Sequence, residues 1–295
     1  MQGPTASGKT ALGIALAKHF KTVILSADSR QFYKEMSIGT AKPSLEEQDE
    51  IKHYFIDSHS IENPVSAADF EREALEVLEN EFQRHENIIL VGGSGMFIDA
   101  LCNGLDDIPN DVKLRDELTL FVQKNGLESL LEELKSNDLE YYNFVDKSNP
   151  VRIIRAIEAI RISGKTYTEL RQKKSKTRPF EIMRFVIDLP REKLYERINL
   201  RADLMIQNGL IDEVKQLTEF RHLQSLNTVG YSEIFDFLDD KISLEEAINL
   251  VKQNSRRYAK RQLTWFRRNE KAIWLKNETT ADLKKEVLGL LNSAQ

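Results

Sequence analysis

The feature that most constrains the fold of this chain is the stretch Gly3-Pro4-Thr5-Ala6-Ser7-Gly8-Lys9-Thr10, close to its N-terminus. A glycine, four residues and then Gly-Lys-Thr are typical of a phosphate-binding loop, because glycines let backbone N–H groups close around phosphate oxygens. In such a loop Lys9 supplies a positive charge and the hydroxyl of Thr10 binds Mg²⁺. A helix is predicted from about Ala11 to His19, and its positive N-terminal dipole would face the same anion. We therefore expect a phosphate compound here, although the loop alone does not say which one.

The loop has little chain in front of it. A phosphate-binding loop normally follows a buried strand, and a strand needs about five or six residues. Only Met1 and Gln2 precede Gly3 in the sequence as given. We therefore expect the loop to lack its supporting strand and the sheet to lack a central member.

Short apolar runs alternate with helical periodicity on both sides of the middle of the chain. The predicted strands are 22–26, 53–57, 87–91, 185–189 and 272–275, and the predicted helices include 66–84, 191–208 and 244–265. Ser66 is a natural N-cap for the first of these helices. Strands that alternate with helices predict an α/β fold with a parallel sheet flanked by helices.

Two polar segments follow predicted strands, at the sheet edge where ligands bind in open α/β folds. Asp28 follows the first strand, and its carboxylate could bind Mg²⁺ through water, accept a proton or cap the next turn. Gly92-Gly93-Ser94-Gly95 follows another strand. Its glycines let the backbone approach a ligand, and close packing of a helix on a strand would require the same residues. The sequence leaves these alternatives open.

The region 105–179 lacks the alternation of strands and helices. Its periodicity predicts helices at 112–124, 127–135 and 150–162, and the basic stretch 172–179 closes it. We predict an all-helical insertion at 105–179 and a catalytic α/β core made of residues 1–104 and 180–295.

The composition bounds the class of protein. The 295 residues are 41% hydrophobic and 30% charged. Neither a run of about eighteen apolar residues nor a signal segment occurs, so we expect no membrane contact and a cytoplasmic location. The single cysteine, Cys102, cannot form an internal disulfide, and the five histidines show no zinc pattern. Nothing in the sequence demands a dimer, so a monomer is expected.

The basic residues are unevenly spread. A net charge of −5 argues against indiscriminate nucleic-acid binding. Two basic clusters nevertheless occur: Arg171, Lys173, Lys174, Lys176 and Arg178, and then Arg256, Arg257, Lys260, Arg261, Arg267 and Arg268. Each cluster is either a solvated face or the contact surface for a polyanion. Arg197 and Arg201 are four positions apart on one predicted helix, which places both guanidinium groups on one face. They would bind a diphosphate together or pair with a carboxylate such as Glu196.

These features together resemble the tRNA dimethylallyltransferases, also called tRNA isopentenyltransferases, over essentially the whole length. Four blocks carry the resemblance: Gly3 to Thr10, Ser26-Ala27-Asp28-Ser29-Arg30-Gln31-Phe32-Tyr33 continuing to Ile38-Gly39-Thr40-Ala41-Lys42-Pro43, Val91-Gly92-Gly93-Ser94-Gly95, and Arg261-Gln262-Leu263-Thr264-Trp265-Phe266-Arg267. The second block is the most specific of the four.

The resemblance implies a reaction and roles for particular residues. A dimethylallyl group would pass from dimethylallyl diphosphate to the exocyclic amine of the adenosine beside the tRNA anticodon, with release of diphosphate. The implied catalytic residues are Asp28, which would accept a proton from the amine, Arg201, Lys9 and Thr10, with Mg²⁺ at Thr10. The implied diphosphate-binding residues are Gly3, Thr5, Ala6, Ser7, Gly8, Lys9, Thr10 and Arg201, where Arg201 rather than Arg197 touches the diphosphate. The implied tRNA-binding residues are Asp28, Ser29, Arg30, Gln31, Ser94, Arg152, Arg155, Thr228, Gly230 and Tyr231.

Two other functions stay open from the sequence. One is prenylation of free adenine nucleotides, against which the helical insertion and the basic clusters count, because a nucleotide needs no such surface. The other is a phosphate-loop kinase or ATPase, for which no convincing aspartate follows a second apolar strand as the Mg²⁺ partner.

Overall fold

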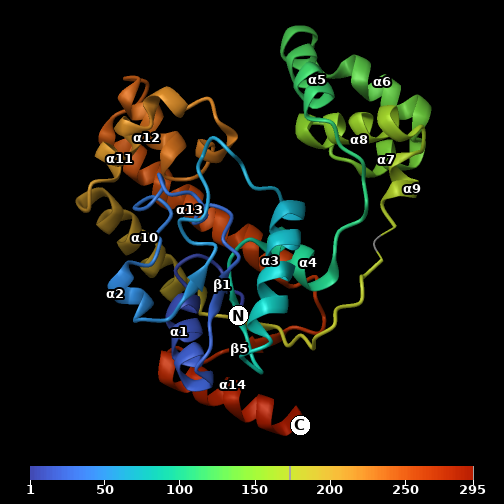
Figure 1. Cartoon of the computed structure of the whole chain (residues 1–295). Helices are drawn as coiled ribbons and strands as arrows, with labels where there is room; N and C mark the ends of the chain where they lie inside the picture. The colour runs from blue at the N-terminus through green and yellow to red at the C-terminus, as the bar shows by residue number, and fades with distance from the viewer. Residues whose placement is uncertain (173, 295) are drawn as a thin grey trace. The chain divides into compact units, whose positions relative to one another are not determined.

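The computed structural model describes residues 1–172 and 174–294, so Lys173 of the first basic cluster lies outside the described residues. The chain divides into two compact units. One unit is Met1–Cys102 together with Pro179–Gln295, and the other is Asn103–Arg178 (Figure 1).

The first unit contains parallel strands in two groups. Strands β1 (Ile24–Ser26), β2 (His53–Tyr54) and β3 (Ile89–Val91) form a sheet in the order β2-β1-β3, and β4 (Phe185–Ile187) pairs with β5 (Ile273–Leu275). All of these pairs are parallel. The prediction of an α/β fold with a parallel sheet flanked by helices is therefore confirmed. Strand β2 is shorter than predicted because Phe55 and Asp57 have positive φ angles of 65° and 53°, which end an extended strand.

Met1 and Gln2 join the two groups of strands. Gln2 forms parallel bridges to Gly92, which follows β3, and to Val186 in β4. Four hydrogen bonds support this position: Gln2 N to Phe185 O at 2.7 Å, Ile187 N to Gln2 O at 3.0 Å, Gly92 N to Met1 O at 3.1 Å, and the Met1 ammonium to Leu90 O at 2.6 Å. As expected, the described strands form two separate groups with no named strand between β3 and β4. Met1 and Gln2 nevertheless pair with both neighbours, so the expectation of an unsupported loop is corrected at that point.

A second feature lies next to Met1. A cavity of about 290 Å³ is lined by β3, by the segment before β4 and by apolar side chains of α1, α3, α4 and α14. Burial lowers the pKa of the Met1 ammonium from 8.0 to about 6. Met1 and Gln2 thus occupy the space between β3 and β4 next to the phosphate loop, and the cavity lies beside them.

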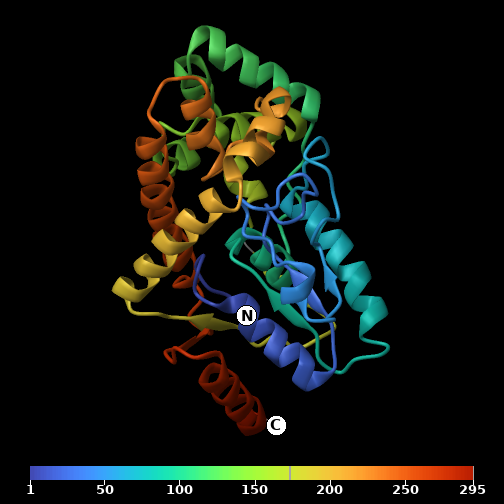
Figure 2. The same cartoon turned by 90° about the vertical axis from the view of Figure 1, so that its left-hand side faces the viewer.

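The helices of the first unit surround these strands. They are α1 (Lys9–Phe20), α2 (Leu45–Gln48), α3 (Ala67–Glu81), α4 (Gly95–Asn103), α10 (Arg191–Gln207), α11 (Leu210–Gln216), the 3₁₀ turns Thr218–Phe220 and Gln224–Leu226, α12 (Tyr231–Leu238), α13 (Leu244–Phe266) and α14 (Thr280–Ala294). Helix α10 lies against α13, and α1 lies against α14 (Figures 1 and 2). Ser66 caps α3 as predicted, and Gly209, with φ 98°, follows the end of α10. The core joins Leu12 and Leu16 of α1 to Leu283 and Val287 of α14.

The regular secondary structure among the described residues of the second unit is helical. They are α5 (Val112–Asn125), α6 (Glu128–Asn137), α7 (Leu139–Phe144), α8 (Pro150–Ser163) and α9 (Tyr167–Leu170). Its own apolar core is centred on α8, where Ile153 and Ile157 are fully buried. Glu158 is also fully buried, and it is held by Arg115 and Arg155. The unit therefore has a hydrophobic centre separate from that of the first unit.

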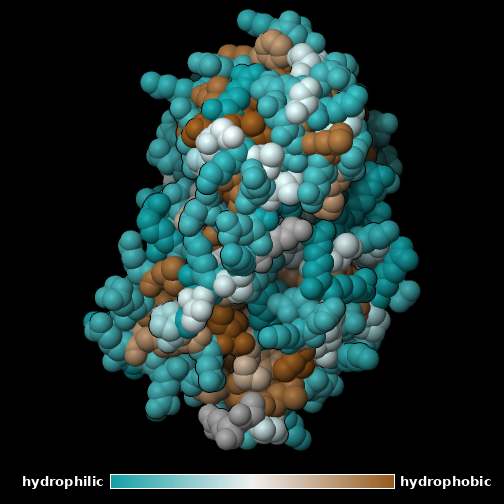
Figure 3. Space-filling view, turned by 90° about the vertical axis from the view of Figure 1, so that its right-hand side faces the viewer, coloured by the Kyte–Doolittle hydropathy of each residue, from teal (hydrophilic) through white to brown (hydrophobic). Residues whose placement is uncertain are grey.

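No helix within the described residues is long and apolar enough to cross a bilayer. On the face shown in Figure 3, apolar side chains gather in the lower part of the molecule among hydrophilic ones.

Candidate active site

The phosphate-binding loop has the backbone geometry that an anion site requires. Ala6 and Gly8 both have positive φ, at 62° and 92°, and Gly8 is the N-cap of α1 without a side-chain hydrogen bond. The first N–H groups of a helix have no partner inside the helix, so those of α1 remain available to an anion. Within the described residues, the buried hydroxyl of Ser7 also has no hydrogen-bond partner. A phosphate group would satisfy these donors.

Gln262 of α13 forms hydrogen bonds with both the phosphate-binding loop and the glycine turn, residues 92–95, that follows β3. Its side-chain oxygen accepts a hydrogen bond from Thr5 N at 2.8 Å, and its side-chain nitrogen donates to Gly93 O at 2.9 Å. A Cβ atom on Gly93 would lie 2.4 Å from the same nitrogen, which explains the need for glycine there. The sequence block around Gln262 was noticed without a role for this residue. Its role depends on a contact across 257 positions, which no local pattern reveals.

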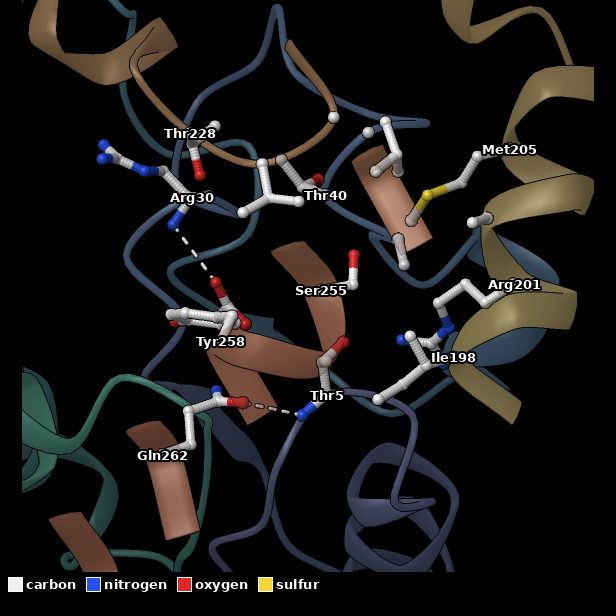
Figure 4. Close-up of a pocket in the computed structure, with 17 residues that line it drawn as sticks. Thr5, Arg30, Thr40, Ile198, Arg201, Met205, Thr228, Ser255, Tyr258 and Gln262 are labelled. Carbon is white, nitrogen blue, oxygen red and sulfur yellow. Dashed lines mark hydrogen bonds between the residues drawn. The ribbon is translucent and has the colours of Figure 1, made fainter. Parts of the chain in front are cut away.

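A cavity of about 100 Å³ opens beside the loop (Figure 4). Its wall has a polar end, with Thr5, Asp28 and Arg201, and an apolar part, with Ile198 and Met205. The other lining residues are Arg30, Gly39, Thr40, Ala41, Ala202, Thr228, Val229, Gly230, Val251, Ser255, Tyr258 and Gln262. This arrangement suits a ligand with one charged end and one apolar end.

Asp28 connects this cavity to the phosphate loop. Asp28 lines both this cavity of about 100 Å³ and a smaller one that is also lined by Lys9 and Thr10. The carboxylate accepts a hydrogen bond from Arg30 N at 3.2 Å, so the turn after β1 fixes its position. Burial lowers the pKa of Lys9 from 10.5 to about 8, while Asp28 raises it and Arg201 lowers it. Burial also lowers the pKa of Arg201, and Asp28 is among the carboxylates that oppose this shift. Lys9, Asp28 and Arg201 thus interact electrostatically, and their catalytic roles stay predictions.

The low pKa of Lys9 predicts a pH-dependent affinity for inorganic diphosphate. An anion favours the charged form of Lys9, so binding above pH 8 takes up a proton, and the Kd should rise by up to about tenfold per pH unit above pH 8. Isothermal titration calorimetry in two buffers of different ionisation enthalpy measures both the Kd and the proton uptake. The Lys9→Arg variant is the matched control, because arginine stays charged throughout. Identical pH profiles for both proteins would contradict the assignment.

Arg197 and Arg201 of α10 lie near the phosphate loop and the cavity beside it. Arg201 lines the cavity, and Arg197 Nη1 lies 3.8 Å from the position that a Cβ atom on Gly8 would take. No ion pair joins Arg197 to Glu196 within the described part of the chain. Arg197 therefore reaches the loop while Arg201 reaches the cavity, and the preference for Arg201 as the diphosphate contact stays a prediction.

Ser29 and Ser94 link the turn after β1 to the glycine turn after β3. Ser29 N donates to Ser94 Oγ at 2.9 Å, and Ser94 Oγ donates to Ser29 Oγ at 3.1 Å. Tyr258 of α13 lies beside them and forms a hydrogen bond with Ser94. Burial and, to a smaller extent, Asp28 raise the pKa of Tyr258 to about 12, although the hydrogen bond with Ser94 lowers it. Both serines are thus engaged within the protein, and Tyr258 is a cavity residue that the sequence analysis missed.

Glu213 of α11 holds the loop that forms one wall of the cavity. Its carboxylate accepts hydrogen bonds from the backbone of Ser37, Ile38 and Gly39 at 3.0, 2.7 and 3.0 Å. It also accepts one from the Tyr231 hydroxyl at 2.6 Å. Tyr231 is fully buried, which argues against the RNA contact expected for its side chain. The correction has a physical reason, since the hydroxyl is needed inside the protein as a donor to Glu213.

Removing the Glu213 carboxylate should loosen this loop. In the Glu213→Ala variant four donors lose their acceptor, and we expect the free energy of unfolding to fall by about 2–3 kcal/mol. The neighbouring Asp212 is exposed, so Asp212→Ala should change it by less than about 0.5 kcal/mol. Urea unfolding followed by circular dichroism measures both values. Equal stability of the two variants would mean that the hydrogen bonds to Glu213 carry no net stabilisation.

The other residues expected to contact RNA fall into two groups. Arg30, Thr228 and Gly230 line the cavity, and Arg152 is exposed on α8. Gln31 and Arg155 are used internally: Gln31 donates to Thr40 O at 3.2 Å and Ala41 O at 3.3 Å, and Arg155 to Pro109 O at 2.7 Å, Ile108 O at 2.9 Å and Glu158 at 2.9 Å. These hydrogen bonds argue against RNA contacts by the side chains of Gln31 and Arg155.

Comparisons with known proteins identify the family of this chain. Residues 31–269 match the family model described as IPP transferase. The chain is 47% identical to tRNA dimethylallyltransferase 1 of Phocaeicola vulgatus over 92% of this chain and 91% of that protein. It is 48% identical to the tRNA dimethylallyltransferase of Cytophaga hutchinsonii, over 92% and 90% of the two chains.

Solved structures give the same result. The crystal structure of the full-length tRNA isopentenylpyrophosphate transferase from Bacillus halodurans matches with a TM-score of 0.71 and 36% identity, over 99% of this chain and 95% of that one. A eukaryotic dimethylallyltransferase acting on tRNA matches with a TM-score of 0.79 and 25% identity, over 93% of this chain and 72% of that one. This chain therefore belongs to the tRNA dimethylallyltransferase family.

Proposed function

We propose that the cavity beside the phosphate loop is where this chain joins a dimethylallyl group to tRNA, with Asp28 as the base. The chain is a tRNA dimethylallyltransferase, and it transfers the group from dimethylallyl diphosphate to the exocyclic amine of the adenosine next to the anticodon. The observation that carries the proposal is the position of Asp28, whose carboxylate lines both the cavity and the space beside Lys9 and Thr10. A base at this junction lies between the leaving group and the acceptor.

The proposed reaction separates charge, and the site is built to accept it. As the allylic C–O bond breaks, its electron pair goes to the diphosphate, and the adenosine nitrogen forms the new bond to the same carbon. Lys9, Arg201 and the N–H groups of the loop would stabilise the growing negative charge. Asp28 would take the proton that the amine nitrogen loses. Arg197, whose guanidinium reaches the N-cap of α1, is a further candidate for the diphosphate.

The residues at the loop also fit Mg²⁺. Thr10 and Asp28 line the same small cavity, and Mg²⁺ is usually held by one or two protein oxygens, several waters and substrate phosphates. We propose that Thr10 would bind the ion directly and Asp28 through water. When bound, Mg²⁺ would supply positive charge to the diphosphate oxygens.

We propose that the adenosine leaves the anticodon loop and enters the cavity from the side of Arg30 and Thr228. Asp28, Ser29 and Ser94 would surround the adenosine, and Arg152 would contact another part of the RNA. Several arginines of the second basic cluster are exposed, among them Arg257, Arg261 and Arg268. They could contact the phosphate backbone of the RNA. We propose that the protein acts on tRNA in the cytoplasm. The proposed assembly is a monomer.

One assay tests the function. The protein is incubated with labelled dimethylallyl diphosphate and Mg²⁺, together with unmodified tRNA in one arm and AMP in the other. Label in tRNA is expected, and it should decline steeply as the salt concentration rises. Label in AMP alone would indicate a nucleotide prenyltransferase, and ATP hydrolysis without prenyl transfer would indicate an ATPase.

A further inference from the structure

The cavity has a direction, because two helices line its length. On α10, Ile198, Arg201 and Met205 face it, at helical spacing. Helix α13, which packs against α10, lines the cavity as well with Val251, Ser255, Tyr258 and Gln262. Gln262 binds the phosphate loop at Thr5, so the positions on both helices lead from the loop toward an apolar end at Met205 and Val251.

The length of this path matches a short prenyl chain. Met205 follows Arg201 by four residues, which is a rise of about 6 Å along a helix. The path from the diphosphate oxygen to the far methyl carbon of a dimethylallyl group has four bonds of about 1.5 Å and spans about 5 Å when extended. A dimethylallyl group whose diphosphate contacts Arg201 would therefore end against Met205. Figure 4 shows the Met205 thioether pointing into the cavity, well away from Thr5.

We propose that Met205 sets the length of the prenyl donor by closing the apolar end of the cavity one helical turn beyond Arg201. This inference rests on the proposed function. A five-carbon donor fits between the two residues, whereas a ten-carbon donor such as geranyl diphosphate meets the thioether. Val251 lines the same end from α13, so shortening Met205 leaves space that is still apolar.

The test compares donors of two lengths in the Met205→Ala variant. Transfer to tRNA is measured with dimethylallyl and with geranyl diphosphate, and the modified nucleoside is identified by mass. We expect the ratio of kcat/KM for geranyl to that for dimethylallyl diphosphate to rise at least tenfold. Leu204 is the matched control, since it precedes Met205 and is 46% exposed. Leu204→Ala should leave the ratio unchanged.

Two further measurements keep the test decisive. Met205→Val is expected to change the ratio in the same direction by a smaller factor, and it serves where the alanine variant does not fold. Met205→Phe should lower kcat/KM for dimethylallyl diphosphate at least tenfold by filling the end of the cavity. Transfer of dimethylallyl groups with an unchanged ratio in the folded variants would overturn the role of Met205. Failure of the unsubstituted protein to prenylate tRNA would instead overturn the proposed function, and the donor-length proposal with it.

Discussion

Replacing Asp28 by asparagine is expected to lower kcat for tRNA prenylation by about 10²–10⁴-fold, the range associated with loss of a general base. The amide keeps the size of the side chain and can still accept the hydrogen bond from Arg30 N, so the turn after β1 should keep its shape. What it loses is the ability to take a proton. Steady-state kinetics with labelled dimethylallyl diphosphate and saturating tRNA measure the change.

Binding measurements separate this chemical effect from a loss of substrate. The Kd for inorganic diphosphate, measured below pH 8, should change less than about tenfold, because Lys9, Arg201 and the loop remain. Asp240→Asn is a suitable control, since Asp240 is exposed at the end of α12. A variant at position 28 that turns over at the rate of this control would remove Asp28 from the role of base.

The second large effect concerns stability. Adding five apolar β-branched residues in front of Met1 should fill the cavity of about 290 Å³ between β3 and β4. The added strand would continue the parallel pairing that Gln2 begins, and it would bury apolar side chains on both faces. After the cost of ordering the new residues, we expect a gain of about 2–4 kcal/mol in the free energy of unfolding. The melting temperature should rise by roughly 5–10 °C.

The pH dependence of stability provides a second readout. The Met1 ammonium has a pKa of about 6 when folded and 8.0 as its ordinary value, so the unfolded chain binds more protons between these values. Stability should therefore fall as the pH decreases from 8 to 6. The extended protein replaces this ammonium by a neutral amide and should lose that slope. An extension of glycine and serine of equal length controls for the amide alone, and if it stabilises as much as the apolar one, filling of the cavity is not the cause.

Much of the fold followed from local sequence patterns. The loop Gly3–Thr10 and the periodicity of the helices predicted the parallel α/β arrangement, because both depend on residues close together in the chain. Strand β2 ended early for a reason that the apolar run at 53–57 did not reveal, namely the positive φ of Phe55. The pairing of Gln2 with two strands was also missed, since the bridge depends on residues far away in the sequence.

The candidate site divides in the same way. Asp28 and Lys9 were identifiable because each follows a recognisable local element. Gln262 and Glu213 were not, because each acts through backbone groups at least 169 positions away. Tyr231 was given an RNA contact by the family resemblance, whereas its buried hydroxyl donates a hydrogen bond to Glu213. Polar residues in a family motif can support the site from within as well as contact the substrate.

The division of the chain into two units also orders the steps by which the site is made during synthesis. The helical unit is one continuous segment, Asn103–Arg178, and every helix of its core is available once that segment has left the ribosome. The other unit must wait, because Leu12 and Leu16 of its first helix pack against Leu283 and Val287 of its last. The phosphate loop is synthesised before the helical unit, whereas Gln262, which holds the loop through Thr5, is synthesised after it. A nascent chain can thus carry a folded helical unit well before it can hold a diphosphate.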